Sequence, residues 1–150
     1  MFDFFKSLRW FPPAETEIPW SAILSAFGRQ CAKFENDLCR YIDVDHCILG
    51  ESARTLLFVL LEELKKVDNG RRHEVLIPGY TCYSVAAAVA KANLKISIYD
   101  LDPKTFCADL DSLEKAVSEN TLAVITQHLF GILTPIDKLK IITHQNGAYL

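Results

Sequence analysis

The sequence predicts an α/β fold in which strands and helices alternate around a mostly parallel sheet. Three observations support this class. Short apolar runs alternate with helix-like segments over most of the chain, and polar residues gather where the apolar runs end. Half of the 150 residues are hydrophobic and the net charge is -3, so the chain can bury one ordinary core. Strands that alternate with helices form parallel sheets covered on both faces.

The predicted elements follow this rhythm in order. Residues 1–19 are predicted to be an aromatic and proline-rich N-terminal arm, and residues 20–150 a single α/β portion. Apolar spacing predicts one helix from Trp20 to about Tyr41, with a break near Gly28, and another from about residue 52 to 67. Asn69 and Gly70 tolerate left-handed geometry and end the second helix. The other predicted strands cover 46–49, 74–77, 95–99 and 122–126, the other predicted helices cover 84–92, 110–117 and 136–144, and residues 148–150 open a further strand.

Composition excludes several function classes. The mild acidity argues against a nucleic-acid partner, which would require a basic surface. The five cysteines are odd in number and lack CxxC pairing, so reduced thiols and no metal site are expected; Cys31, Cys39 and Cys47 are equally spaced but have only His46 nearby. Charged residues interrupt the aromatic N-terminus, which therefore resembles neither a signal peptide nor a membrane span. A cytoplasmic protein is expected, with the arm packed on protein or, alternatively, lying as a weak interfacial helix.

The first candidate site is the turn Gly50-Glu51-Ser52-Ala53-Arg54, at the start of a predicted helix. A helix N-terminus offers unpaired N–H groups and a partial positive charge, to which a phosphate binds. Ser52 and Arg54 can add hydrogen bonds. The alternative is that Ser52 simply caps the helix.

Two further candidates lie where predicted strands end. The loop Pro78–Ser84 carries a phenol and a hydroxyl that suit a flat ligand if the phenol is buried; alternatively it is a satisfied turn with two packing tyrosines. At residues 126–131, His128 either contacts a ligand or bonds a neighbouring loop, and it is not expected to be a catalytic base. GxGxxG, GxxxxGK[ST], GxSxG and HExxH do not occur, which removes much of the support for dinucleotide-binding, NTP-binding, hydrolase and metalloprotease functions. No residue of the chain is predicted to be catalytic.

The motifs together resemble the DegT/StrS-type sugar aminotransferases. Residues 33–64 look like the family's Phe-Glu helix, strand and phosphate-binding turn. Residues 74–131 are similar to its next section, in which a Pro-x-x-Thr loop, a strand ending in Asp-x-Asp, a Thr-x-Ala-Val strand and a His-x-x-Gly turn follow in that order. The resemblance extends from about Ile18 to Leu150. It is specific, because several weak motifs in correct order and spacing are much less probable by chance than any one of them.

The resemblance implies part of the large domain of a fold-type I transferase that uses pyridoxal 5'-phosphate. The cofactor phosphate would rest at Ser52, Ala53 and Arg54, and its ring near Thr81, Cys82 and Tyr83. Cys82 stands where the family often has the aromatic residue that stacks on the ring, with Tyr83 next to it. Ala53 stands where glycine is common, which ordinary backbone angles would tolerate.

The resemblance also implies groups that residues 1–150 do not contain. The aspartate that binds the pyridine nitrogen and the Schiff-base lysine are both expected beyond Leu150, so this chain alone is not expected to transaminate. Later strands complete the family's sheet, so this chain alone is also expected to fold poorly, with apolar sheet edges exposed. The intact enzyme would be a homodimer that moves an amino group, typically from glutamate, to a keto group of a nucleotide-linked sugar or similar carbonyl compound. Two alternatives stay open at this point: a non-catalytic remnant or binding module, and an unrelated α/β nucleotide-binding domain.

Overall fold

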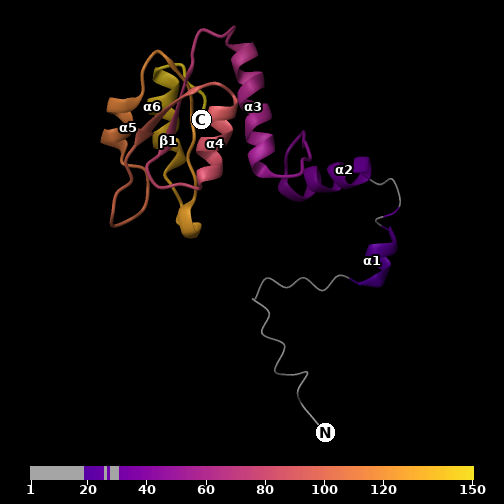
Figure 1. Ribbon diagram of the computed structural model, residues 1–150. Coiled ribbons are helices and arrows are strands. Elements are labelled where there is room, and N and C mark those ends of the chain that lie inside the picture. Colours follow the sequence, from indigo (N-terminus) through magenta and orange to yellow (C-terminus); the bar gives the residue numbers. More distant parts are fainter. Residues whose placement is uncertain (1–18, 26, 28–30) are drawn as a thin grey trace. The chain divides into compact units, whose positions relative to one another are not determined.

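The computed structural model describes residues 19–25, 27 and 31–150 (Figure 1). For residues 31–33 it describes the backbone only. The chain divides into two compact units, Met1–Leu49 and Gly50–Leu150, and each is described here by itself. The predicted N-terminal arm lies outside the described residues except for Pro19. Among the described residues, none of the helices combines the length and the apolar character that a membrane crossing requires.

In the first unit the helix predicted from Trp20 is divided into two. Helix α1 spans Trp20–Ser25 and helix α2 spans Cys31–Ile42; the predicted break at Gly28 falls among residues outside the description. The strand predicted at 46–49 is wrong, because these residues have no strand partner and Ile48 is largely exposed. A short extended segment becomes a strand only through pairing with a neighbour.

The second unit contains the other elements that the sequence predicts. They are α3 (Ala53–Val67), β1 (Glu74–Pro78), α4 (Tyr83–Lys91), β2 (Lys95–Tyr99), α5 (Leu110–Ala116), β3 (Thr121–Val124) and α6 (Ile136–Gln145). A short 3-10 helix, η2 (Leu129–Gly131), was not predicted. Asn69 and Gly70 adopt positive φ after α3, as their sequence predicts.

The three strands form a parallel sheet in the order β2-β1-β3. Glu74 pairs with Lys95 on one side of β1, and Leu76 pairs with Val124 on the other. Tyr149 forms a further parallel bridge to Ala123, donating its N–H to Leu122 at 3.0 Å and accepting from the N–H of Val124 at 2.8 Å. Of the buried strand predicted to open at residues 148–150, the structure shows a single bridge at Tyr149, with Ala148 buried and Tyr149 and Leu150 exposed.

Helices cover both faces of this sheet. Figure 1 shows α3 and α4 on one side of β1 and α5 and α6 on the other. Val75 and Ile77 of β1 pack with Leu61 of α3 and Val89 of α4, whereas Leu76 packs with residues of α5 and α6. This alternation follows from the two-residue period of a strand, which points successive side chains to opposite faces.

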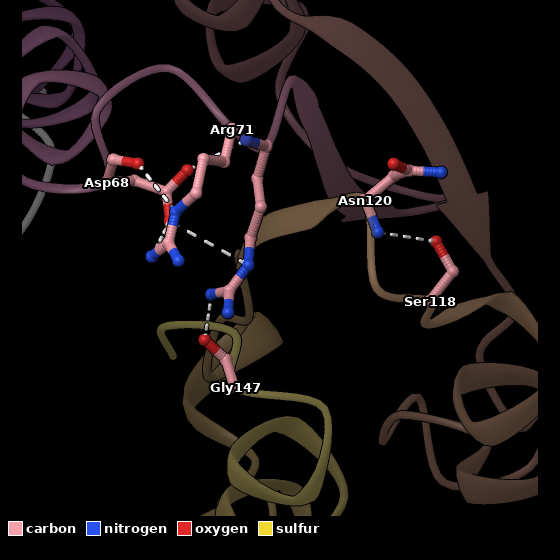
Figure 2. A network of polar contacts seen from close by, with 6 residues as sticks. Asp68, Arg71, Ser118, Asn120 and Gly147 are labelled. Carbon is pink, nitrogen blue, oxygen red and sulfur yellow. Dashed lines mark hydrogen bonds and ion pairs between the residues drawn. The ribbon is translucent and has the colours of Figure 1, made fainter.

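Polar contacts close the sheet at the end where its strands begin (Figure 2). Buried Asp68, which follows α3, accepts from the N–H of Arg72 at 2.7 Å and from the Arg71 guanidinium at 3.3 Å. Arg72 in turn donates to the carbonyl of Gly147, 75 residues along the chain. The end of α3 is thereby joined to the turn that precedes the bridge at Tyr149.

Candidate functional site

The strand order locates the site at one edge of the sheet. From β1 the chain crosses over α4 to β2 on one side and then over α5 to β3 on the other, so the order reverses between β1 and β3. Ligands of open α/β sheets bind outside the carboxyl ends of the strands at such a reversal. The loop after β1, residues 79–82, and the loop after β3, residues 125–128, both lie at this edge.

The side chain of Gln127 joins these two loops. It accepts a hydrogen bond from the Thr81 hydroxyl at 3.0 Å and donates one to the carbonyl of Tyr80, also at 3.0 Å. Both polar atoms of the amide are thus used, and each bond crosses from one loop to the other. Gln127 was part of a candidate segment in the sequence but was not assigned a role, because no local pattern says which distant residue it meets.

His128 orders its own loop. Its Nδ1 accepts from the N–H of Thr134 at 3.1 Å, and the Thr134 hydroxyl donates to the carbonyl of Gln127 at 2.9 Å. A neutral imidazole that accepts at Nδ1 carries its proton on Nε2. The sequence allows His128 either a ligand contact or a bond to a neighbouring loop; the bond that the structure shows is to Thr134, within the same connection between β3 and α6.

The predicted phosphate-binding turn begins helix α3. The Ser52 hydroxyl accepts from the N–H of Thr55 at 3.2 Å, so Ser52 is the cap that the sequence offers as an alternative to a ligand contact. The Thr55 hydroxyl donates to Glu51 at 3.1 Å, and Ser52 must therefore be the donor in the bond between the two hydroxyls. The first-turn N–H groups of Ala53 and Arg54 have no acceptor within the helix and stay available to an anion.

The start of α4 lies near this turn. Cys82, which precedes α4, is exposed, and its sulfur accepts from the Ser84 hydroxyl at 3.0 Å. The side-chain and backbone hydrogen bonds of Ser84 lower the pKa of the Cys82 thiol, and the positive charge of Arg54 adds to this effect. The charge of Arg54 in α3 therefore reaches Cys82 at the start of α4.

The aromatic side chains at this edge differ from the prediction. The expectation of a buried phenol in the loop after β1 is wrong, since Tyr80 is 60% and Tyr83 76% exposed. Tyr80 tilts against Phe130 with ring centroids 6.5 Å apart, and Phe130 meets Phe106 edge to face at 6.0 Å. Phe106 and Phe130 both have positive φ, which is unusual for bulky residues and which no turn residue in the sequence signals.

Comparison with known proteins assigns the family. The model of the DegT/DnrJ/EryC1/StrS aminotransferase family matches residues 14–150. The chain belongs to this family. The resemblance drawn from the sequence motifs is confirmed. The fold class is confirmed as well, because the similar solved structures share this fold, that of the fold-type I enzymes.

Individual relatives cover nearly all of this chain but a minor part of their own length. It is 29% identical over 132 residues to the L-glutamine:2-deoxy-scyllo-inosose aminotransferase of Streptomyces kanamyceticus, covering 88% of this chain and 29% of that protein. It is 25% identical to the GDP-4-keto-6-deoxy-D-mannose 3-dehydratase of Yersinia pseudotuberculosis, covering 82% and 32%. The putative sugar aminotransferase Spr1654 of Streptococcus pneumoniae, in its PLP form, has a TM-score of 0.79 at 22% identity, covering 93% and 38%. At that identity the structural likeness shows the fold alone.

Proposed function

We propose that this chain is the N-terminal part of the large domain of a pyridoxal-phosphate-dependent aminotransferase. The whole enzyme would move an amino group from glutamate or a related donor to a keto group of a nucleotide-linked sugar or similar carbonyl compound. The observation that carries this proposal is the joining of the loops after β1 and β3 by Thr81 and Gln127 at the switch point, with the charge of Arg54 acting on Cys82, in a chain of this family. The homodimer and the cytoplasmic location stay predictions.

The residues at the turn fit the cofactor's phosphate. The free N–H groups of Ala53 and Arg54 point out of the first turn of α3, where the helix dipole favours negative charge. The Arg54 guanidinium adds a second positive charge. The Ser52 proton is directed to Thr55, so the hydroxyl would have to rotate before it could donate to phosphate. We therefore assign the phosphate chiefly to the two N–H groups and Arg54.

The loop after β1 fits the ring. Thr81 is held in place by its hydrogen bond to Gln127. Among the predicted ring contacts Thr81, Cys82 and Tyr83, Tyr83 is the aromatic side chain, and it is exposed. Stacking on a flat heterocycle requires such an accessible ring face. When bound, pyridoxal phosphate supplies an electron sink for the negative charge that develops when a substrate carbon loses its proton. The residues of this chain hold and orient that group, and they do not themselves move the proton.

The test requires a full-length version of the protein. Titration with pyridoxal phosphate should produce a bound-cofactor absorbance band, and Arg54→Gln should weaken binding by about fivefold, since an exposed charge-assisted hydrogen bond contributes about 1 kcal/mol. Arg40→Gln is the matched control, because Arg40 is an exposed helical arginine outside the site. Failure of the full-length protein to bind the cofactor would overturn the proposal.

A second assay distinguishes the reaction. Because one relative is a 3-dehydratase, the products from a GDP-linked 4-keto sugar should be compared by mass spectrometry with glutamate and with glutamine as donors. An amino sugar supports amino transfer, and a deoxy sugar without nitrogen supports dehydration instead. Binding of cofactor without either product would favour the non-catalytic remnant.

A further inference from the structure

The two polar atoms of the Gln127 side chain face different partners in the loop after β1. Its Nε2 donates to the carbonyl of Tyr80 and its Oε1 accepts from the Thr81 hydroxyl, each at 3.0 Å. A backbone carbonyl can only accept a hydrogen bond, so the NH2 group must face Tyr80 and the amide oxygen must face Thr81. The direction of both bonds is therefore fixed, and the Thr81 hydroxyl is the donor to Gln127.

The backbone that carries Gln127 is held by two side-chain hydroxyls from other segments. The hydroxyl of Thr134, a buried residue before α6, donates to the carbonyl of Gln127 at 2.9 Å. Two residues before Gln127, the carbonyl of Ile125 accepts from the hydroxyl of Tyr99, which is buried at the end of β2, at 3.0 Å. Tyr80, in contrast, is 60% exposed. Gln127 thus reaches from an anchored backbone to an exposed loop, and it can determine where that loop lies.

We propose that Gln127 is a positioning residue for the pyridoxal phosphate ring and that it acts through Thr81. This inference rests on the proposed function, in which the ring lies near Thr81, Cys82 and Tyr83. Because Gln127 holds the loop after β1 before a ligand arrives, less ordering is needed when the ring binds. The Thr81 proton is already donated to Gln127, so this hydroxyl accepts from an N–H or O–H group of the ligand.

The alternative is that Gln127 stabilises the fold without affecting the ligand. Its side chain is half-buried, and loss of two neutral hydrogen bonds at such a position lowers the free energy of unfolding wherever it occurs. A purely stabilising residue would change the stability of the protein without cofactor, but not the orientation of a bound ring. A measurement that reports on the ring itself therefore separates the two roles.

The experiment is titration of the full-length enzyme proposed above with pyridoxal phosphate, followed by visible circular dichroism of the bound cofactor. Gln127→Met keeps the length of the side chain and removes both hydrogen bonds. It should weaken cofactor binding by about fivefold, the effect of about one neutral hydrogen bond, and reduce the dichroism per bound cofactor. Gln145→Met is the matched control, because Gln145 is an exposed glutamine in the last turn of α6, and it should change neither quantity.

A double-mutant cycle shows whether Gln127 acts through Thr81. Thr81→Val removes the hydroxyl that Gln127 and the ligand share, and by itself it should weaken binding by about fivefold. Together with Gln127→Met it should weaken binding by about five- to tenfold, whereas independent effects would multiply to about twenty-five-fold. Thr81→Ser keeps the hydroxyl, so Gln127→Met should keep its full effect when combined with it.

A second variant covers the case in which Gln127→Met does not fold, which a urea titration without cofactor would reveal. Gln127→Asn keeps the amide but is one methylene shorter, so it cannot reach both Tyr80 and Thr81 and should show the same loss. Wild-type enzyme that fails to bind the cofactor would refute the proposed function, and this inference with it. Wild-type binding with unchanged affinity and dichroism in the folded Gln127 variants would overturn this inference alone, as would a twenty-five-fold loss in the double variant.

Discussion

Replacing Glu74 with glutamine is expected to loosen the joint between β1 and β2. Glu74 is a buried carboxylate at the start of β1, and its Oε1 accepts from Lys95 at 2.7 Å and from Ser97 at 2.6 Å, both in β2. Its Oε2 accepts from Ser118, before β3, at 3.4 Å. One charged side chain thus touches groups on both neighbours of the central strand.

The size of the effect follows from these contacts. Hydrogen bonds to a charged group contribute about 1.5–3 kcal/mol each, and neutral ones about 1 kcal/mol. The contribution of Lys95 is discounted, because its side chain is 65% exposed and water screens its charge. Glutamine keeps one acceptor oxygen, but its NH2 group replaces the second carboxylate oxygen of Glu74 and cannot accept a hydrogen bond. The net loss of opening free energy should be about 2 kcal/mol, which corresponds to about thirtyfold faster exchange.

Native-state hydrogen exchange measures this loss at the amides of β1 and β2, in the full-length enzyme proposed above. Lys95→Met is the matched control. It leaves Glu74 the hydroxyl donors Ser97 and Ser118, so it should lower the opening free energy less than Glu74→Gln does. If the two variants cost the same, or if Glu74→Gln leaves exchange unchanged, the carboxylate does not hold the strands together in the way described.

The effect should also depend on pH. Burial acts to raise the pKa of Glu74, but hydrogen bonds from Lys95, Ser97 and Ser118, with the charge of Lys95, outweigh it and hold the pKa below its usual value. A carboxyl group with a depressed folded-state pKa stabilises the fold fully above its unfolded pKa of about 4.3, and this stabilisation is lost as the pH falls through the lower folded-state value. The difference between wild type and Glu74→Gln should therefore be constant above about pH 5 and shrink below about pH 4.

Three other predictions concern single positions. Gly147→Ala should lower the free energy of unfolding, measured by urea titration, by about 2 kcal/mol, because Gly147 has a φ of 68° and a Cβ there would lie 2.7 Å from the Arg72 guanidinium. Gly70 has a similar φ but open space around it, so Gly70→Ala should lower the same free energy by about 1 kcal/mol. Ser52→Ala should cost about 1 kcal/mol through loss of the α3 cap, and Ser52→Asp should restore most of it; equal losses in both would contradict a capping role. The lowered pKa of Cys82 should make it react with iodoacetamide at lower pH than an ordinary thiol, and Ser84→Ala should move that reactivity to higher pH.

The expectation that the chain alone folds poorly has its own test. Hydrogen exchange of the purified chain should show weak protection in β1 and β3, because three strands and one bridge leave sheet edge and apolar side chains such as Ile98 exposed. Strong protection across both strands would mean that the two apolar clusters suffice for independent folding.

Part of the site was predictable because its residues stand at element ends. Serine before an apolar helix predicts both a cap and a phosphate-binding turn, and the structure shows the cap at Ser52. The loop after β1 was likewise recognisable from its place in the rhythm of strands and helices. The partner of Thr81 was not, since Gln127 lies 46 residues away and only the pairing of β3 beside β1 brings it near.

The sequence by itself determined the order of the elements in Gly50–Leu150, because apolar periodicity and end signals such as Asn69 and Gly70 are local properties of the chain. It also determined the family, through motifs whose order does not depend on folding. The tertiary structure decided the strand order, the loss of the strand at 46–49, the exposure of Tyr80 and Tyr83, and the role of His128 in ordering its loop. Each of these depends on which distant groups become neighbours, and pairing and burial are set by the whole fold, so no local pattern contains them.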